Sequence, residues 1–395
     1  MYAAVHGDRH GRVYVSEGHS AAGIGGPEAR PLAETIALPE GARLVPLPRE
    51  ASAFGRNGRI RGQGAGRLAL GAVLPAGHVR LLAPSYRDDR AAVDLEPLPY
   101  CAVGARPDGE LVVAARAVGP PARQAPAPAG WTAALRERPS NALVRQLARC
   151  ARENGCVAAQ TGLGRGLLPV PLGAAPAEAP RLPLAIRSAY PGTPHERAAL
   201  RPTAAEIAEL GADHLGRGGS GVAFGRACDG EPLGAIRVLE AAVARLRAPG
   251  VEVLVETSGS DPAALRRAID AGVTAVTVRI ASARRETYEL LHGPVAHGWS
   301  EVRASLRLAA EHRLLTLALL VLPGLSDTPA EMEALLALIA ELPGGRLELR
   351  DLGADHVRTL AALPHAPAAG LGTLLDRLGE ADHFRLRPAE EPAAV

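Results

Sequence analysis

Lysine is absent from this chain of 395 residues, and all 44 residues counted as lysine plus arginine are arginine. The absence excludes three kinds of site that depend on a lysine amine: a Schiff-base lysine, a phosphate-loop lysine and a lysine general base. Strong cationic contacts in any site are therefore left to arginine.

The sequence also lacks an excess of charge of either sign. Its 44 basic and 42 acidic residues give a formal net charge of +2. This balance gives no signal for nucleic acid and no general attraction to a membrane surface.

Long apolar runs are missing as well. The stretch "LLTLALLVLP" ends at Pro323 and has the length of a buried strand, well short of the roughly 18–20 residues that cross a membrane. The first residues, "MYAAVHGDRHGR", are charged and contain no apolar segment of the kind found in signal peptides. We expect a cytoplasmic protein without a membrane span.

Cysteine is scarce, with four residues scattered along the chain: Cys101, Cys150, Cys156 and Cys228. Without a secretory signal, reduced thiols are the expectation and disulfides are not.

The chain is long enough for two domains with their own cores, since domains usually have on the order of 100–200 residues. Residues 1–118 contain short apolar or alternating runs separated by Gly and Pro, which predicts a β-rich domain. The clearest hairpin surrounds Pro107-Asp108-Gly109. Residues 119–181 are expected to form a Pro-rich linker, a helix over 140–154 with Ser140 as N-cap, and a loop over 161–181.

Residues 182–395 alternate between strand and helix patterns in six units that begin with "LPLAIR". One helix is expected to open at Pro202-Thr203, and another has Asp261 as its expected N-cap. The predicted fold class is α/β, with a parallel sheet covered by helices. A flat doubly wound sheet and a partial barrel both fit this alternation. In either case, ligands bind beyond the carboxyl ends of the strands.

The segments at these strand ends follow a recognisable order. "GRACDGEPL", "ETSGSDP", "VRIASA", "VLPGLSDTPAEME" and "LELRDLGAD" follow the second to sixth predicted strands. In order and spacing this set resembles the radical S-adenosylmethionine (SAM) superfamily over about 200 residues, and "PLPYCAVG" and "LARCARENGCVAAQ" resemble the N-terminal part of one bacterial subgroup. The resemblance implies a partial (β/α)6 barrel and a site for SAM.

Radical SAM enzymes also hold a 4Fe–4S cluster through three cysteines spaced CxxxCxxC. The corresponding stretch here is "PVPLGAAPAEAP", which places Ala174, Glu178 and Arg181 where the thiolates belong. No cysteine occurs between Cys156 and Cys228. The resemblance therefore includes the cofactor site but lacks the cluster ligands.

The resemblance implies a set of cofactor-binding candidates at the strand ends: Asp229, Gly230, Glu231, Pro232, Ser258, Arg279, Ser282 and Arg350.

Simpler structural roles compete with cofactor binding at these positions. Glu231 can cap the helix that follows it, and Gly230 can serve the turn alone. Arg279 can pair with Glu256 or Asp351, and Arg350 with Asp355. Asp229, and His214 on its helix, are expected to be solvated.

Three functions are compatible with these observations. The favoured one is a cluster-free homologue that binds SAM, a related small molecule or a protein partner without radical chemistry. The second is an enzyme of metal-free chemistry that uses Asp229, Glu231, Arg279 and Asp351 as acid/base and anion-binding groups. The third is an active radical SAM enzyme with unorthodox cluster ligands, drawn from the four cysteines.

Overall fold

The structure is a computed structural model that describes all residues except 27, 76, 88–94, 96–97, 119–130, 153–162, 165, 173–199, 226–229, 293–296, 354–355, 362, 365, 381–384 and 389–395.

The first part of the chain folds into antiparallel sheets. Its strands are β1 (Ala3–Gly7), β2 (Val13–Ser20), β3 (Ala22–Ile24), β4 (Ala29–Pro31), β5 (Ile36–Ala37), β6 (Arg43–Phe54), β7 (Ile60–Gly62), β8 (Leu68–Val73), β9 (His78–Arg80), β10 (Ala83–Pro84), β11 (Tyr86–Arg87), β12 (Cys101–Ala105), β13 (Leu111–Val113) and β14 (Ala115–Ala117). The pairings β6–β2, β2–β1, β1–β8 and β8–β6 form a closed circuit. The predicted hairpin is confirmed as β12–β13, and Gly109 adopts the positive φ of 90° that its turn requires.

The second part of the chain forms a parallel sheet with helices between its strands. The elements are α1 (Trp131–Glu137), α2 (Ala142–Arg152), β15 (Leu167–Val170), α4 (Ala204–Gly216), β16 (Gly221–Phe224), η1 (Pro232–Ala235), α5 (Ile236–Leu246), β17 (Glu252–Thr257), α6 (Pro262–Ala271), β18 (Ala275–Ile280), α7 (Arg285–His292), α8 (Trp299–Glu311), β19 (Leu315–Val321), α9 (Pro329–Ala340), β20 (Arg346–Asp351), α10 (His356–Ala361), α11 (Leu371–Gly379) and β21 (Arg385–Pro388). Within the described residues the sheet has seven strands in the order β15 to β21. The predicted parallel α/β arrangement is confirmed.

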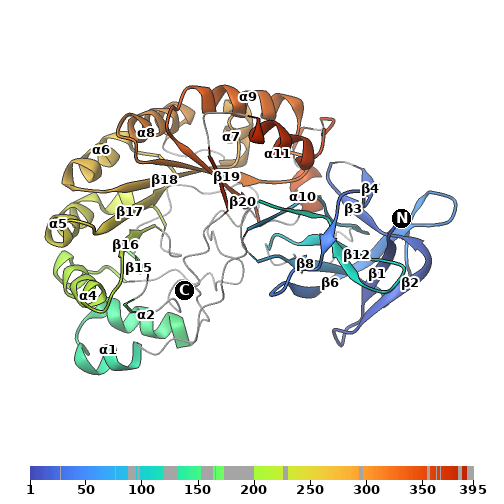
Figure 1. Cartoon of the computed structure of the whole chain (residues 1–395), viewed down its shortest axis with the longest axis horizontal. Helices are drawn as coiled ribbons and strands as arrows, with labels where there is room; N and C mark the ends of the chain where they lie inside the picture. Colours follow the sequence, from blue (N-terminus) through green and yellow to red (C-terminus); the bar gives the residue numbers. More distant parts are fainter. Residues whose placement is uncertain are drawn as a thin grey trace.

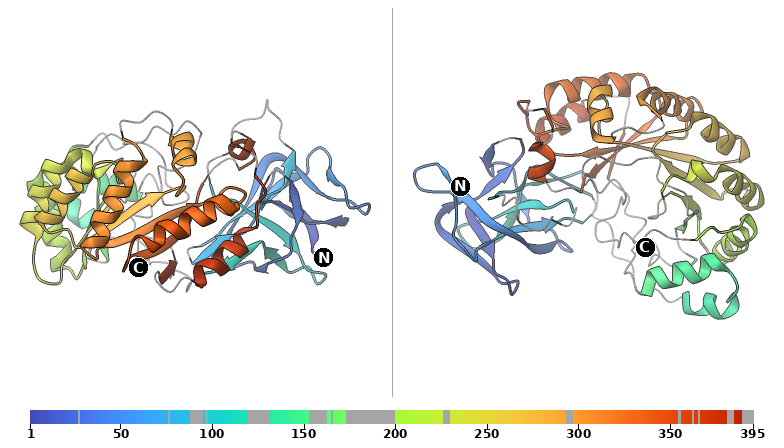
Figure 2. Two further views of the ribbon diagram at one scale, coloured as in Figure 1. Left: turned by 90° about the horizontal axis from the view of Figure 1, so that it is seen from above. Right: turned by 180° about the vertical axis from the view of Figure 1, so that it is seen from behind.

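The sheet is curved, and helices α4, α5, α6, α8 and α9 lie on its convex side, while the antiparallel part of the chain lies beside β20 (Figures 1 and 2). Strand residues alternate between the two faces. Val255, Val278 and Leu347 belong to the large apolar core that the sheet shares with the helices. On each strand, the residues that alternate with these core residues lie on the opposite, concave face of the sheet.

The beginning of the parallel sheet corrects the sequence analysis. Residues 161–181 were expected to form a loop, but Leu167–Val170 form strand β15, which pairs with β16. Proline is rare inside sheets except on edge strands, and Pro169 lies on β15 at the edge of this sheet. The expected strand at 182–187 lies outside the described residues, and the proposed domain boundaries stay predictions.

Local signals place most helix starts correctly. Thr203 caps α4 and Asp261 caps α6, where the Asp261 carboxylate accepts a hydrogen bond from the Ala264 N–H. The expected N-cap at Ser140 is wrong by one residue, because Asn141 Oδ1 accepts the hydrogen bond from the Val144 N–H.

His214 is buried, which corrects the expectation that it is solvated. Its Nδ1 accepts a hydrogen bond from the Gly164 N–H at 2.9 Å, and its Nε2 lies 2.9 Å from the Gly166 carbonyl. Burial lowers the pKa of the imidazole. The side chain therefore ties α4 to the segment that enters β15.

Arginines connect the two parts of the chain. Arg80, at the end of β9, is completely buried and donates hydrogen bonds to the carbonyls of Tyr100 and Leu352 at 3.1 and 2.6 Å. Arg30 donates to the Ala368 carbonyl, and Arg116 forms an ion pair with Asp376 on α11. The N-terminal strands are thus fastened to β20 and to the segments that follow it.

Asp327 lies in the turn between β19 and α9 and predicts a pH dependence. Its Oδ1 accepts a hydrogen bond from the Gly324 N–H, and burial raises its pKa from 3.8 to about 6. Between these values the folded protein holds a proton that the unfolded chain has lost, so the free energy of unfolding falls as pH rises through this window. Asp327→Asn keeps the acceptor oxygen and removes the charge. We expect the free energy of unfolding of Asp327→Asn to fall less than that of the wild type across this pH window, by on the order of 1–3 kcal/mol.

Urea denaturation at several pH values measures the effect. Asp270→Asn, at an exposed position of α6, is the matched control and should follow the wild-type curve. An unchanged slope in Asp327→Asn would contradict the prediction.

Candidate ligand-binding site

The carboxyl ends of β16 to β20 meet at one edge of the parallel sheet, so the segments resembling the radical SAM motifs come together. Gly230 and Glu231 follow β16, Ser258 follows β17, and Ser282 follows β18. Asp229 and Cys228 lie outside the described residues.

Glu231 is a buried carboxylate whose acceptor positions are filled by its own chain. Oε1 accepts hydrogen bonds from Thr257 Oγ1 at 2.6 Å and from the Leu233 N–H at 3.2 Å. Oε2 accepts from both the N–H and the hydroxyl of Ser258, at 2.8 and 2.7 Å. A carboxylate offers about four acceptor sites. Glu231 thus caps η1 and holds the end of β17, as its simpler alternative role predicts.

Gly230 and Pro232 set the backbone around Glu231. Gly230 has a φ of 93°, which favours glycine, and Pro232 is the first residue of η1, where a missing N–H costs no hydrogen bond. These residues turn the chain from β16 into the helix.

A cluster of four charged side chains lies on the concave face of the sheet. The register aligns Glu256 of β17 with Thr277, and Glu348 and Arg350 of β20 with Ala318 and Leu320. Arg279 is two residues beyond Thr277 and thus on the same face. Two carboxylates and two guanidinium groups meet there: Glu256, Arg279, Glu348 and Arg350.

Arg350 is the centre of this concave cluster. Its Nη1 and Nη2 donate to the two oxygens of Glu256 at 2.7 and 3.2 Å. Its Nε and Nη2 donate to those of Glu348 at 2.7 and 3.0 Å. All three side chains are buried. Arg350 therefore pairs with two carboxylates from strands that are not neighbours in the sheet, and Arg279 supplies the second positive charge of the cluster.

Arg279 has a different environment. Its Nε lies 3.6 Å from Glu256 Oε1 and, among the described residues, has no hydrogen-bond partner. The side chain is 12% exposed. The pairing with Glu256 is one of the two that the sequence analysis considered. Arg350 already donates to both oxygens of Glu256, so Nε of Arg279 is a donor that another acceptor could use.

Arg279 also affects a neighbouring histidine. Burial lowers the pKa of His292, on α7, to about 4, and the positive charge of Arg279 contributes to this shift. His292 is therefore neutral at physiological pH and adds no positive charge beside Arg279.

Asp351 does not join the concave cluster. It follows Arg350 on β20, so its side chain lies on the other face, where its Oδ2 accepts a hydrogen bond from the Arg80 N–H at 3.2 Å. Burial raises the pKa of Asp351 to about 6. Glu231 thus pairs with Thr257 and Ser258, and Asp351 with Arg80, rather than with Arg279. The described members of the proposed metal-free acid/base set therefore share no common centre.

Ser282 has a structural partner as well. Its hydroxyl donates to Glu331 Oε2 at 2.7 Å and accepts a hydrogen bond from the Arg284 N–H. The serine joins the end of β18 to the first turn of α9.

Glu348 and Glu331 were missed by the sequence analysis. The alternation in "RLELRDL" could have placed Glu348 on the same face as Arg350. Nothing in the sequence marks Glu331, since it lies in the first turn of a helix, where a carboxylate is common.

The two cysteines that the structure describes lie away from this edge. Cys101 lies on β12 in the antiparallel part, where burial raises the pKa of its thiol and the Ala114 carbonyl accepts its hydrogen bond. Cys150 lies on α2 and accepts a hydrogen bond from Gln146. Cys156, Cys228 and residues 173–181 are outside the described residues. The loop after β15 contains no cysteine in its sequence.

No family model and no curated protein matches this chain. Solved structures match parts of it. They include a domain of pyruvate-formate lyase-activating enzyme from Bacteroides vulgatus (14% identity, 43% of this chain and 99% of that one, TM-score 0.32). A radical SAM methyltransferase from Sphaerobacter thermophilus has 16% identity, with 47% and 56% of the two chains covered and a TM-score of 0.33.

A third match is HydG, a maturase of the FeFe-hydrogenase, with 17% identity, 44% of this chain and 41% of that one covered, and a TM-score of 0.32. With TM-scores this low, the matches do not define the function of this chain.

Among the described residues, no helix has the length and apolar character to cross a membrane.

Proposed function

We propose that this chain is a radical-SAM-like partial (β/α)6 barrel with a β-rich N-terminal domain, and that it binds SAM on its concave face without radical chemistry. The ordered strand-end segments support the barrel. The lack of any cysteine between Cys156 and Cys228 supports a protein that holds no cluster at the usual loop. In this proposal the protein binds SAM as a complex and does not convert it to a radical.

The observation that carries this proposal is Arg279. A guanidinium group that is mostly shielded from water is costly unless it is paired and hydrogen-bonded. The Arg279 side chain is 12% exposed, and its Nε has the 3.6 Å contact to Glu256 but no hydrogen-bond partner among the described residues. A ligand carboxylate would complete its pairing. SAM carries such a carboxylate, and Arg279 lies near the end of β18, in the segment "VRIASA" that resembles the family.

The other candidate residues shape the site around Arg279. Glu231 and Ser258 hold the β16 and β17 ends together. Contact with the amino group of SAM is then left to the backbone near Gly230. Arg350 holds Glu256 and Glu348 in place beneath it.

Calorimetric titration of the full chain with SAM tests the proposal. We expect saturable binding that Arg279→Gln weakens by at least about tenfold, the effect of losing one charge-assisted contact. Arg266→Gln, at an exposed position of α6, is the control and should bind like the wild type. Methylthioadenosine, which lacks the carboxylate, should bind equally to wild type and Arg279→Gln.

Anaerobic reconstitution with iron and sulfide tests the absence of the cluster. We expect no stoichiometric iron. Iron in the ratio of a 4Fe–4S cluster would show an active radical enzyme with unorthodox ligands, and failure to bind SAM would reject the site at Arg279.

A further inference from the structure

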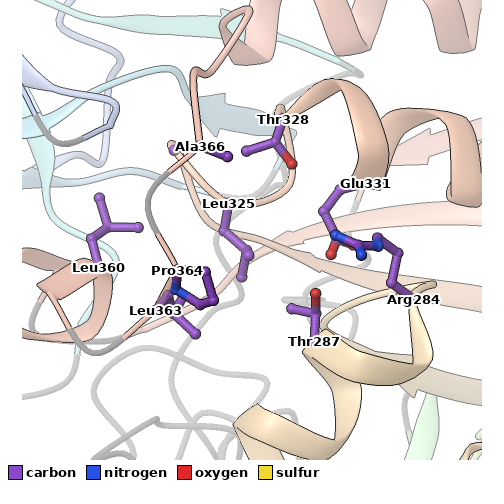
Figure 3. A pocket seen from close by; sticks show the side chains of 10 residues that line it. Arg284, Thr287, Leu325, Thr328, Glu331, Leu360, Leu363, Pro364 and Ala366 are labelled. Carbon is purple, nitrogen blue, oxygen red and sulfur yellow. The ribbon is translucent and has the colours of Figure 1, made fainter.

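A second site lies outside the concave cluster. A pocket of about 90 Å³ opens at the rim of the sheet between the start of α7, the turn after β19 and the segment that follows α10 (Figure 3). Its lining includes Arg284, Thr287, Glu331, Leu325, Leu360 and Leu363, and none of the four residues of the concave cluster. We call it the rim pocket.

Glu331 brings an unused acceptor to the rim pocket. Its Oε2 accepts the hydrogen bond from Ser282, but its Oε1 is buried and has no hydrogen-bond partner in the part of the chain that the structure describes. The side chain as a whole is 4% exposed. A buried oxygen without a donor is unfavourable, so this carboxylate is suited to a ligand that supplies one. Burial raises its pKa, against the effect of the hydroxyls of Thr287 and Ser282.

Arg284 supplies the opposite charge at the mouth of the pocket. Its side chain is 39% exposed, and its Nη2 lies 3.6 Å from Glu286, a residue that is itself largely exposed. Arg284 and Glu331 are both described, and no ion pair within 4.0 Å joins them. The two charges flank the pocket without a direct ion pair, and the positive charge of Arg284 opposes the rise in the pKa of Glu331.

The remaining wall is apolar. Figure 3 shows Leu360, Leu363 and Pro364 on the side of the pocket opposite Thr287, Glu331 and Arg284, with Leu325 between them. This apolar wall suits a short aliphatic group.

We propose that the rim pocket binds an α-amino acid with a short aliphatic side chain. Its ammonium group donates to Glu331 Oε1, its carboxylate accepts from Arg284, and its side chain packs against Leu325, Leu360 and Leu363. A zwitterion matches the two flanking charges, and a short aliphatic chain matches the apolar wall. This site is separate from the SAM site proposed above and does not depend on it.

Calorimetric titration of the full chain with L-valine tests the proposal. We expect saturable binding, with isobutylamine and 3-methylbutanoate, which each lack one charged group, binding at least about tenfold more weakly. Arg284→Gln should weaken valine binding by a similar factor. The neighbouring Arg285→Gln, whose partner is Glu289 outside the pocket, should leave it unchanged.

Glu331→Gln is the second variant and should also weaken binding. Should it fail to fold, the exposed Arg284→Gln and the two analogues still decide the question. No saturable binding of valine, or binding that Arg284→Gln leaves intact, overturns the proposal. Arg279→Gln should not affect valine, and competition between SAM and valine would show that the rim pocket is not a separate site.

Discussion

Replacing Arg350 with methionine is expected to lower the free energy of unfolding by about 3–5 kcal/mol, the usual cost of removing one partner from a buried ion pair. Arg350 pairs with Glu256 and Glu348 through four hydrogen bonds. Without it, two buried carboxylates share a single cation, Arg279, whose Nε lies 3.6 Å from Glu256 Oε1. Repulsion and lost hydrogen bonds then act together, and urea denaturation measures the sum.

A second substitution separates the charge effect from lost packing. In Arg350→Met/Glu348→Leu, one carboxylate and one guanidinium remain, so the cluster is again balanced, and we expect most of the lost stability to return. Arg346→Met changes an exposed arginine of the same strand and should cost less than about 1 kcal/mol. A double variant no more stable than Arg350→Met would mean that packing, not charge, explains the loss.

Arg80→Met is expected to have a comparably large effect, about 3–5 kcal/mol, because it removes the buried connection between the two parts of the chain. The Tyr100 and Leu352 carbonyls lose their donors, and Asp351 loses the cation 3.7 Å away. His356 does not replace that cation, since burial, the main cause of its low pKa, persists in the variant. Denaturation followed by circular dichroism measures the loss.

The pH dependence of the free energy of unfolding tests whether Asp351 contributes to the loss of stability in Arg80→Met. Its folded pKa of about 6 is above the ordinary value of 3.8, so its contribution is most favourable below 3.8 and is lost as pH rises through 6. Arg80 opposes this shift. In Arg80→Met the folded pKa rises further, and stability should continue to fall above pH 6.

Adding Asp351→Asn to Arg80→Met should flatten this fall. Arg87→Met, at an exposed arginine of the antiparallel part, is the control and should keep the wild-type slope. If Arg80→Met and the wild type have parallel pH curves, Asp351 does not depend on Arg80 for its charge state.

Some features of this fold depend only on residues that are close together in the sequence. The helix caps at Thr203 and Asp261 and the turn at Gly109 depend on residues within a few positions of each other. Sequence patterns predict them for that reason. The strands β16 to β20 were predicted because their apolar runs reflect burial against helices. Strand β15 was missed, because four residues containing a proline resemble a loop until β16 pairs with them.

The sequence by itself determined the α/β alternation, the absence of any lysine site, and the absence of cysteine between Cys156 and Cys228. Only the tertiary structure decided the partners of the charged residues. Arg350 meets Glu256 from 94 positions away, and Arg80 meets Leu352 from 272. These pairs depend on strand register and on the docking of the two parts of the chain. No short-range pattern encodes either, whereas capping and periodicity act within a single turn or strand.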